Sequence, residues 1–174
     1  MKSIYRDCYD KKIKYMSLTG IFAALITLMT AYICHIPIGI NGGYVHFGDA
    51  FIYLAAALLP RPYALAAAAI GGGLADLLTA PMWAPATILI KMAVALLFTD
   101  KEAHVINIKN VMSTIWAYLI SGVGYYLAEW LMFENGAVFA VTMAQTAVQS
   151  IGSAVVFIVL GLALDRAGVK RRFL

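Results

Sequence analysis

Long runs without a charged side chain constrain the fold of this chain more than any other feature of its sequence. Residues 15–34 form one such run, and residues 137–164 form another. A helix needs about 20 apolar residues to cross a bilayer, so each run predicts a membrane-spanning helix. The first run is too long for the apolar core of a signal peptide and lacks a small-residue cleavage site, so we expect it to be retained.

Composition extends this prediction to the whole chain. Of its 174 residues, 63% are hydrophobic and 13% are charged, and the mean hydropathy is +0.83, whereas about a quarter of the residues in a soluble domain are charged. We expect an all-α integral membrane protein whose residues 1–174 form a single membrane domain of six transmembrane helices. Two predicted spans are short and end or begin at prolines, so we expect them to lie against their neighbours. The predicted spans are residues 15–34, 47–59, 63–80, 85–98, 111–133 and 137–164.

The positive charges predict the orientation of the chain. Twelve of its 13 lysine and arginine residues lie in the two terminal segments and in the connections after the second and fourth spans. With six spans, all of these segments fall on one side of the membrane. Because positively charged segments are retained in the cytoplasm, we expect a multi-pass protein with both termini cytoplasmic. The basic pI near 9.1 then reflects topology and contact with the lipid bilayer, and no nucleic-acid partner is expected.

Four charged residues lie within or at the edge of the predicted spans. A charged side chain is costly against lipid, so each must face protein, water or a ligand. In the predicted orientation the three carboxylates lie toward the outer ends of their spans, and the lysine lies near the middle of the fourth. The four are Asp49, Asp76, Lys91 and Glu129. Polar and aromatic residues of the last three spans are concentrated toward the same side, as a pocket open to the exterior requires.

The candidate pocket residues come from these outer halves and from the outer loops. Several are four residues apart and therefore share a helix face. Two alternatives stay open: Lys91 is neutralised internally by Glu129 or Asp76, and the tryptophans anchor the chain at the bilayer surface. The candidate substrate-binding residues are Tyr44, His46, Trp83, Thr87, Lys91, Tyr125, Glu129, Gln145 and Gln149.

The sequence lacks the common motifs of nucleotide and hydrolytic chemistry. It has no GxxxxGK[ST] phosphate-binding loop, so the energy for any active transport must come from a partner. It has no HExxH or GxSxG segment either, so we expect neither an enzyme nor a cofactor. A metal site built from His35, His46 and Asp49 is an alternative, but the glycine-rich loop leaves the spacing of these residues undetermined, and we expect no bound metal.

Three segments carry a resemblance to a known family. They are NGGYVHFGDAFIYLAAALLP after the first span, GGGLADLLTAPMWAPATILIKMAVALL across the third and fourth, and the basic C-terminal end. Over nearly its whole length the chain resembles the substrate-binding S component of an energy-coupling factor (ECF) vitamin transporter, in the riboflavin-type branch. The small-xxx-small motif of the family is matched by Gly20 and Ala24, a spacing that allows close helix packing.

The resemblance implies a division of labour between this chain and its partners. It implies a subunit that captures a small substrate outside a prokaryotic cell, docks on a transmembrane coupling protein that carries two cytoplasmic ATPases, and releases the substrate inward. Gly20 and Ala24 would contact the coupling protein, and the loop with Gly39, Gly42 and Gly43 would act as the gate. The alternatives are a stand-alone facilitator and a membrane protein without a transport function.

The chemistry of the candidate residues leaves the substrate open. Glu129 offers an anion to an amine, the glutamines can pair with an amide-like ring edge, and aromatic side chains can stack on a flat ring. Lys91, if not neutralised internally, would instead favour a carboxylate or phosphate. We favour a neutral or cationic flat heterocycle: a pyridoxine-like vitamin, a thiamine pyrimidine precursor, riboflavin, or a 7-deazapurine such as queuosine.

Overall fold

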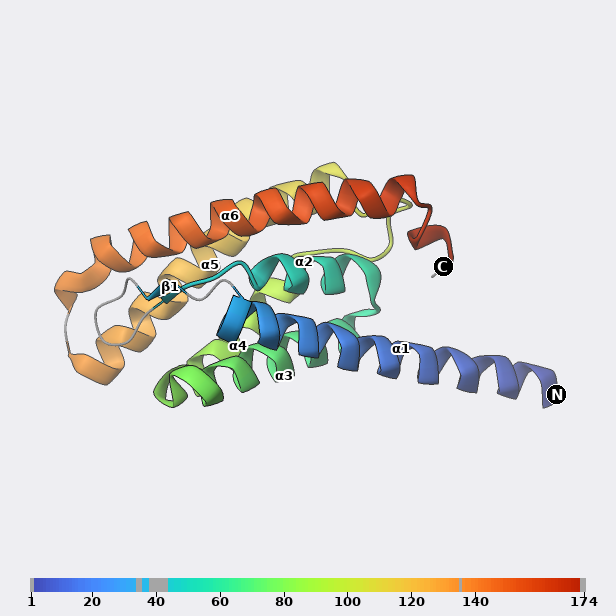
Figure 1. Ribbon diagram of the computed structural model, residues 1–174, viewed down its shortest axis with the longest axis horizontal. Helices are drawn as coiled ribbons and strands as arrows, with labels where there is room; N and C mark the ends of the chain where they lie inside the picture. The colour runs from blue at the N-terminus through green and yellow to red at the C-terminus, as the bar shows by residue number, and fades with distance from the viewer. Residues whose placement is uncertain (1, 34–35, 38–43, 135, 173–174) are drawn as a thin grey trace.

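The computed structural model describes residues 2–33, 36–37, 44–134 and 136–172, most of which are helical (Figure 1). The long elements are α1 (Lys2–Leu28), α2 (Asp49–Leu58), α3 (Arg61–Thr79), α4 (Ala84–Ala95), α5 (Ile108–Phe133) and α6 (Phe139–Arg166). Short helical turns are η1 (Met29–Ile33), η3 (Pro81–Trp83), η4 (Gly136–Val138) and η5 (Lys170–Arg172). Strands β1 (Ile36–Pro37) and β2 (Tyr44–Val45) pair antiparallel, with Ile36 opposite Val45.

Two features differ from the sequence prediction. The first helix begins at Lys2, well before the predicted start of the span at residue 15. Residues 2–14 contain neither glycine nor proline, so nothing in this polar segment interrupts the helix. Because the segment is rich in charged residues, its hydropathy is too low for it to be included in a predicted membrane span. The two-residue strands are the second difference, because an all-α fold was expected and periodicity cannot detect so short a ladder.

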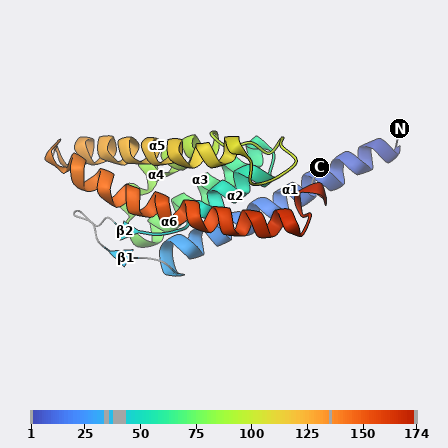
Figure 2. The same ribbon diagram turned by 90° about the horizontal axis from the view of Figure 1, so that it is seen from above.

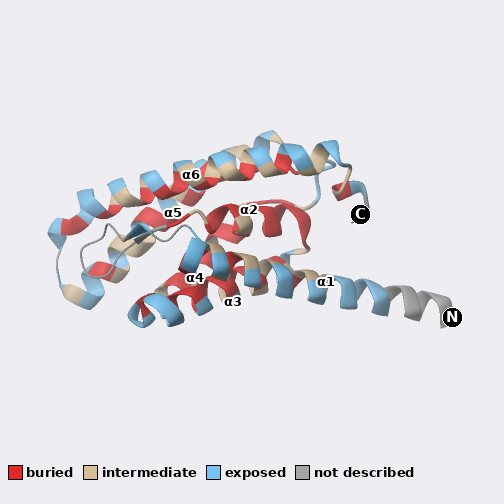
Figure 3. Cartoon of the chain, in the orientation of Figure 1, coloured by how far each residue is buried: buried red, intermediate tan, exposed pale blue. Residues whose placement is uncertain are grey.

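The helices lie roughly along one axis, and both chain ends are at the same end of the molecule (Figures 1 and 2). The turns between α3 and α4 and between α5 and α6 lie at the opposite end. Helix α2 runs through the middle, and nine of its ten residues are buried (Figure 3). A helix that is apolar on all sides is stable only when it is enclosed by others, which explains why so short a segment is so hydrophobic.

The outer helices suit a lipid environment. Among the residues that the structure describes, four helical segments are long and apolar enough to cross a membrane: Tyr9–Ile33, Arg61–Thr79, Ile108–Phe133 and Gly136–Arg166. On α6, Ile151, Val155 and Val159 are four residues apart and all exposed, forming an apolar stripe on the outer face. This mostly helical, apolar-faced bundle agrees with the predicted integral membrane protein. Asp49–Leu58 and Pro81–Ala95 are shorter apolar helices packed among the long ones.

Close packing of α1 on α3 depends on Gly71. A β-carbon at this position would lie 2.7 Å from Ile26 Cβ and 2.9 Å from the carbonyl oxygen of Ala23. Thr27 ties the same two helices together, because its hydroxyl donates to the carbonyl oxygen of Gly71 at 3.0 Å. Small residues at such crossings let helix backbones approach closely within a bilayer.

We expect Gly71→Val to destabilise the bundle by about 1–3 kcal/mol, the usual cost of forcing extra atoms into a packed contact. The measurement is the midpoint of thermal unfolding of the purified chain in detergent. Gly20→Val is the matched control on α1, because a β-carbon there meets nothing within 4 Å. Equal midpoints for the two variants would show that the α1–α3 contact is looser than described.

Candidate functional site

A buried ion pair joins the start of α2 to the middle of α4. The ammonium of Lys91 lies 2.7 Å from Asp49 Oδ1 and donates to Oδ2 at 2.9 Å. Both residues are 1% exposed. The side-chain amide of Gln149 on α6 also donates to Asp49 Oδ2, at 2.9 Å. Asp49 therefore connects α2, α4 and α6, and its place in the first turn of α2 puts a negative charge at the favourable end of the helix dipole.

An aromatic and hydroxyl layer adjoins this ion pair. The Lys91 ammonium lies 5.3 Å from the centroid of the Tyr125 ring, within the range of a cation–π interaction. The hydroxyls of Tyr125 and Thr87 are 3.0 Å apart. Trp83 meets the Tyr125 ring edge-on at 6.2 Å. Residues from η3, α4 and α5 thus converge on Tyr125, and the Asp76 carboxylate of α3 interacts electrostatically with both Lys91 and Tyr125.

The absence of a side chain at Gly72 lets α4 approach α3 beside the ion pair. A β-carbon on Gly72 would lie 3.2 Å from both Lys91 Cγ and Thr87 Cγ2. This spacing is tighter than ordinary van der Waals contact, so a larger residue would displace the lysine stem. Gly72 therefore leaves room for the Lys91 stem between α3 and α4.

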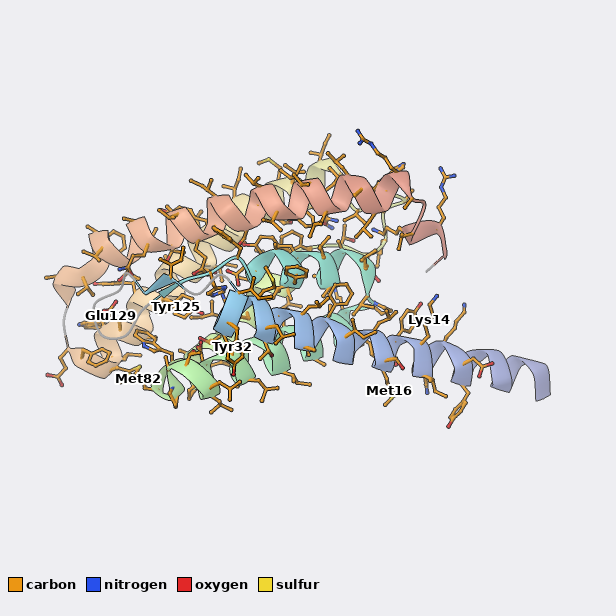
Figure 4. All side chains as sticks on the ribbon, viewed as in Figure 1. Lys14, Met16, Tyr32, Met82, Tyr125 and Glu129 are labelled. Carbon is orange, nitrogen blue, oxygen red and sulfur yellow. The ribbon has the colours of Figure 1, made fainter. Side chains whose placement is uncertain are left out.

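Glu129 lies one helical turn beyond Tyr125 on α5, toward the end of the molecule away from the termini (Figure 4). It is buried, and its Oε2 accepts a hydrogen bond from the Thr142 hydroxyl of α6 at 2.7 Å. The charged group is thus held between the last two long helices. Gln145, one turn from Thr142 on α6, is half-buried.

His46 fixes the backbone that leads into α2. Its Nδ1 accepts the N–H of Gly48 at 3.1 Å and lies 3.4 Å from the Thr30 hydroxyl. An Nδ1 that accepts this hydrogen bond places a ring proton on Nε2. His46 therefore holds the segment just before Asp49 against the end of the first helix.

Several of the residues predicted from the sequence come together in the structure, but the sequence analysis did not include Asp49, the residue that connects them, among the substrate-binding candidates. Trp83, Thr87, Lys91, Tyr125 and Gln149 belong to one contact network, while Glu129 is held by Thr142. The partner of Lys91 is Asp49, and not the Glu129 or Asp76 that the sequence suggested. Asp49 was assigned to the outer edge of a span, and only the central position of α2 shows that it is buried. In the sequence, the indication that Asp49 is buried was its position as a carboxylate in the first turn of a short helix that is otherwise apolar on all sides.

Some predicted positions lie outside the described residues. These are the loop glycines Gly39, Gly42 and Gly43, the side chain of Tyr44, and His35 of the alternative metal site. Within the described part of the chain, no group of three metal-ligating side chains is found. Gly20 and Ala24 are both exposed on α1.

Fold and network together define a small helical membrane protein with a polar, charged interior. A family model for the ECF-type riboflavin transporter S component matches residues 10–166. The chain therefore belongs to the ECF S-component family, whose members are the substrate-binding components of vitamin transporters and not enzymes; they bind small molecules and work with an ECF module.

A protein of Pyrococcus woesei, described as an uncharacterized protein in the gap 3' region, is also similar to this chain. It is 26% identical over 113 residues, which are 64% of this chain and 76% of the relative. That description names no activity.

Proposed function

We propose that this chain captures a small vitamin or related heterocycle outside a prokaryotic cell and delivers it inward. A transmembrane coupling protein and two cytoplasmic ATPases would supply the energy. The observation that carries the proposal is the buried polar and aromatic network in the half of the bundle away from the chain termini, in a protein of a substrate-binding transporter family. A network of this kind suits the recognition of a flat, polar molecule.

The orientation in the membrane is part of the same proposal. Helices α1 to α6 would all take part in crossing the bilayer as a single membrane domain, with the shorter α2 and α4 enclosed by the four longer helices. An even number of crossings agrees with the two termini lying at one end of the molecule. Lys11, Lys12, Lys14, Arg61, Lys101, Lys109 and Arg166 belong to the segments at that end. The positive-inside rule therefore supports a cytoplasmic location for both termini and an outward-facing location for the network.

Each group in the network has a chemical role in the proposed binding. Trp83 and Tyr125 present aromatic rings that can stack on a heterocycle. Gln145 and Gln149 can both donate and accept hydrogen bonds at the edge of such a ring, and Thr87 can do the same with its hydroxyl. Tyr44, His46 and the loop glycines 39, 42 and 43 would close over the substrate. The candidate substrates are a pyridoxine-like vitamin, a thiamine pyrimidine precursor, riboflavin and a 7-deazapurine of the queuosine type.

Ligand affinity of variants tests this site. We expect Glu129→Ala and Gln149→Ala each to weaken substrate binding by more than about tenfold, or about 1.4 kcal/mol, because each removes a buried polar partner. The measurement is calorimetric titration of the purified chain without ATP. Glu134→Ala is the control, because Glu134 is an exposed carboxylate just past the end of α5. Unchanged affinity in both site variants would place the substrate elsewhere.

A further inference from the structure

Four buried hydroxyl groups in the bundle have no hydrogen-bond partner among the described residues. They belong to Tyr53 on α2, Ser121 on α5, and Ser150 and Ser153 on α6, and each of these residues is at most 5% exposed. A hydroxyl held away from water without a partner is costly, and buried polar groups in folded proteins are almost always hydrogen-bonded. Each of the four hydroxyls therefore requires a partner that the side chains around it do not supply.

The three serines differ from other hydroxyl residues of the same helices. A serine or threonine within a helix commonly donates to a carbonyl oxygen one turn earlier. The Ser113 hydroxyl does so on α5 and the Thr146 hydroxyl does so on α6, each at 2.8 Å. Ser121, Ser150 and Ser153 make no such bond within the described chain. Their hydroxyls are therefore available to a partner from outside their own helices.

Helix register places two of these hydroxyls just beyond the buried ion pair. Helices α2 and α6 run in the same direction, toward the end of the molecule with the chain termini (Figure 1). The hydrogen bond from Gln149 to Asp49 fixes their register. Tyr53 and Ser153 each follow one of these residues by four positions, so both lie about one turn closer to the termini. The Tyr53 hydroxyl also interacts electrostatically with the Asp49 carboxylate.

Helix α5 brings a third side to the same level. It runs antiparallel to α6 (Figure 1), and a β-carbon at Gly122 would lie 3.8 Å from Thr146 Cγ2. Ser121 precedes Gly122, and Ser150 follows Thr146 by one turn, so these two serines lie at about the same depth. Three helices thus contribute to one hydroxyl layer, which consists of Tyr53, Ser121, Ser150 and Ser153.

An aromatic cluster closes this layer on the side toward the chain termini. The Tyr53 ring stacks on Phe98 with centroids 4.7 Å apart and meets Phe157 edge-on at 5.8 Å. Both phenylalanines are buried. The hydroxyl layer therefore lies between the ion pair and an apolar ring cluster, and only a molecule held inside the protein can satisfy its hydrogen bonds.

We propose that the hydroxyl layer is a binding site for ordered water, with about one or two molecules shared among the four hydroxyls. Water suits the layer because it donates and accepts hydrogen bonds, as each hydroxyl does, and a buried water makes about three of them. Water beside the Asp49–Lys91 pair also lowers the cost of holding these two charges inside the bundle. The site is separate from the proposed substrate site and does not depend on the identity of the substrate.

The sign of a stability change tests for this water. We expect Tyr53→Phe and Ser153→Ala each to lower the midpoint of thermal unfolding of the ligand-free chain in detergent by about 2–4 °C, the shift for one net hydrogen bond lost from a chain of this size. In a layer without water, the same substitutions would remove an unsatisfied hydroxyl and leave the midpoint unchanged or higher, which would overturn the inference. The control is Ser17→Ala, at an exposed position of α1, which should not lower the midpoint.

Radiolytic labelling detects the water without relying on stability. Hydroxyl radicals formed from bound water oxidise the side chains beside it, even where bulk solvent has no access. We expect oxidation of Tyr53 in the folded, ligand-free chain, retained in Ser17→Ala and largely lost when Ser150→Ala and Ser153→Ala are combined. An unlabelled Tyr53, or labelling that persists in the double variant, would overturn the inference and leave the proposed function intact.

Discussion

Replacing Lys91 with methionine is expected to lower the free energy of unfolding by about 3–5 kcal/mol, the largest stability effect of any substitution considered. The variant would leave the Asp49 carboxylate buried without the ammonium, although the Gln149 amide would still donate a hydrogen bond to it. Removing one member of a buried ion pair is far more costly than removing both, because the other charge stays away from water. The measurement is equilibrium unfolding of the purified chain in mixed micelles.

Two further variants make this expectation specific. Lys101→Met removes a lysine that is exposed in the α4–α5 connection, so it should change stability by less than about 0.5 kcal/mol. Asp49→Asn combined with Lys91→Met removes both charges and should recover part of the loss. If Lys91→Met were as mild as Lys101→Met, the ion pair would be solvated and the description of a buried hub would be wrong.

Replacing Gly20 or Ala24 with tryptophan is expected to reduce substrate uptake to the background of cells that lack this chain. Both positions are exposed on α1, and a β-carbon on Gly20 would meet nothing within 4 Å. A tryptophan can therefore project from the bundle without disturbing it, yet would prevent the close approach of a partner helix. Uptake of labelled substrate in cells containing the coupling protein and ATPases is the measurement.

The control for this surface is Ile115→Trp, on an exposed position of α5. That variant should transport normally, and all three purified variants should keep the ligand affinity of the parent chain. Loss of binding together with uptake would indicate misfolding in place of blocked docking. Full uptake by both α1 variants would place the coupling interface on another helix.

The helices of this bundle follow from the sequence because apolar runs and prolines mark them directly. Predicted spans 63–80 and 111–133 correspond to α3 and α5 at 61–79 and 108–133. The start of α1 at Lys2 was not predicted, because the charged residues at its beginning give no hydrophobic pattern. The only indication of a helix there is the absence of glycine and proline. The paired strands β1 and β2 are too short for any periodic pattern.

The candidate site was predictable residue by residue but not pair by pair. Spacing of four placed Thr87 with Lys91 and Tyr125 with Glu129 on common faces, which any helix imposes. Which helix faces meet depends on how the helices pack, and the sequence does not give this. Packing brings Lys91 against Asp49, which is 42 residues away in the sequence. The same limit applies to His46, whose contacts with Thr30 and Gly48 arise only after the chain turns back on the end of α1.

Native mass spectrometry of the detergent-purified chain is the most direct test of the central claim, that this protein alone binds a small heterocycle. Two samples would be compared. The first is the protein purified directly from a host that transports the substrate, and the second is the protein emptied of ligand and then mixed with vitamins and deazapurines. We predict one adduct per chain, formed without ATP and without partner subunits, and displaced by excess of the same compound. A folded chain that retains no small molecule from the host and binds none of the candidates would contradict the account.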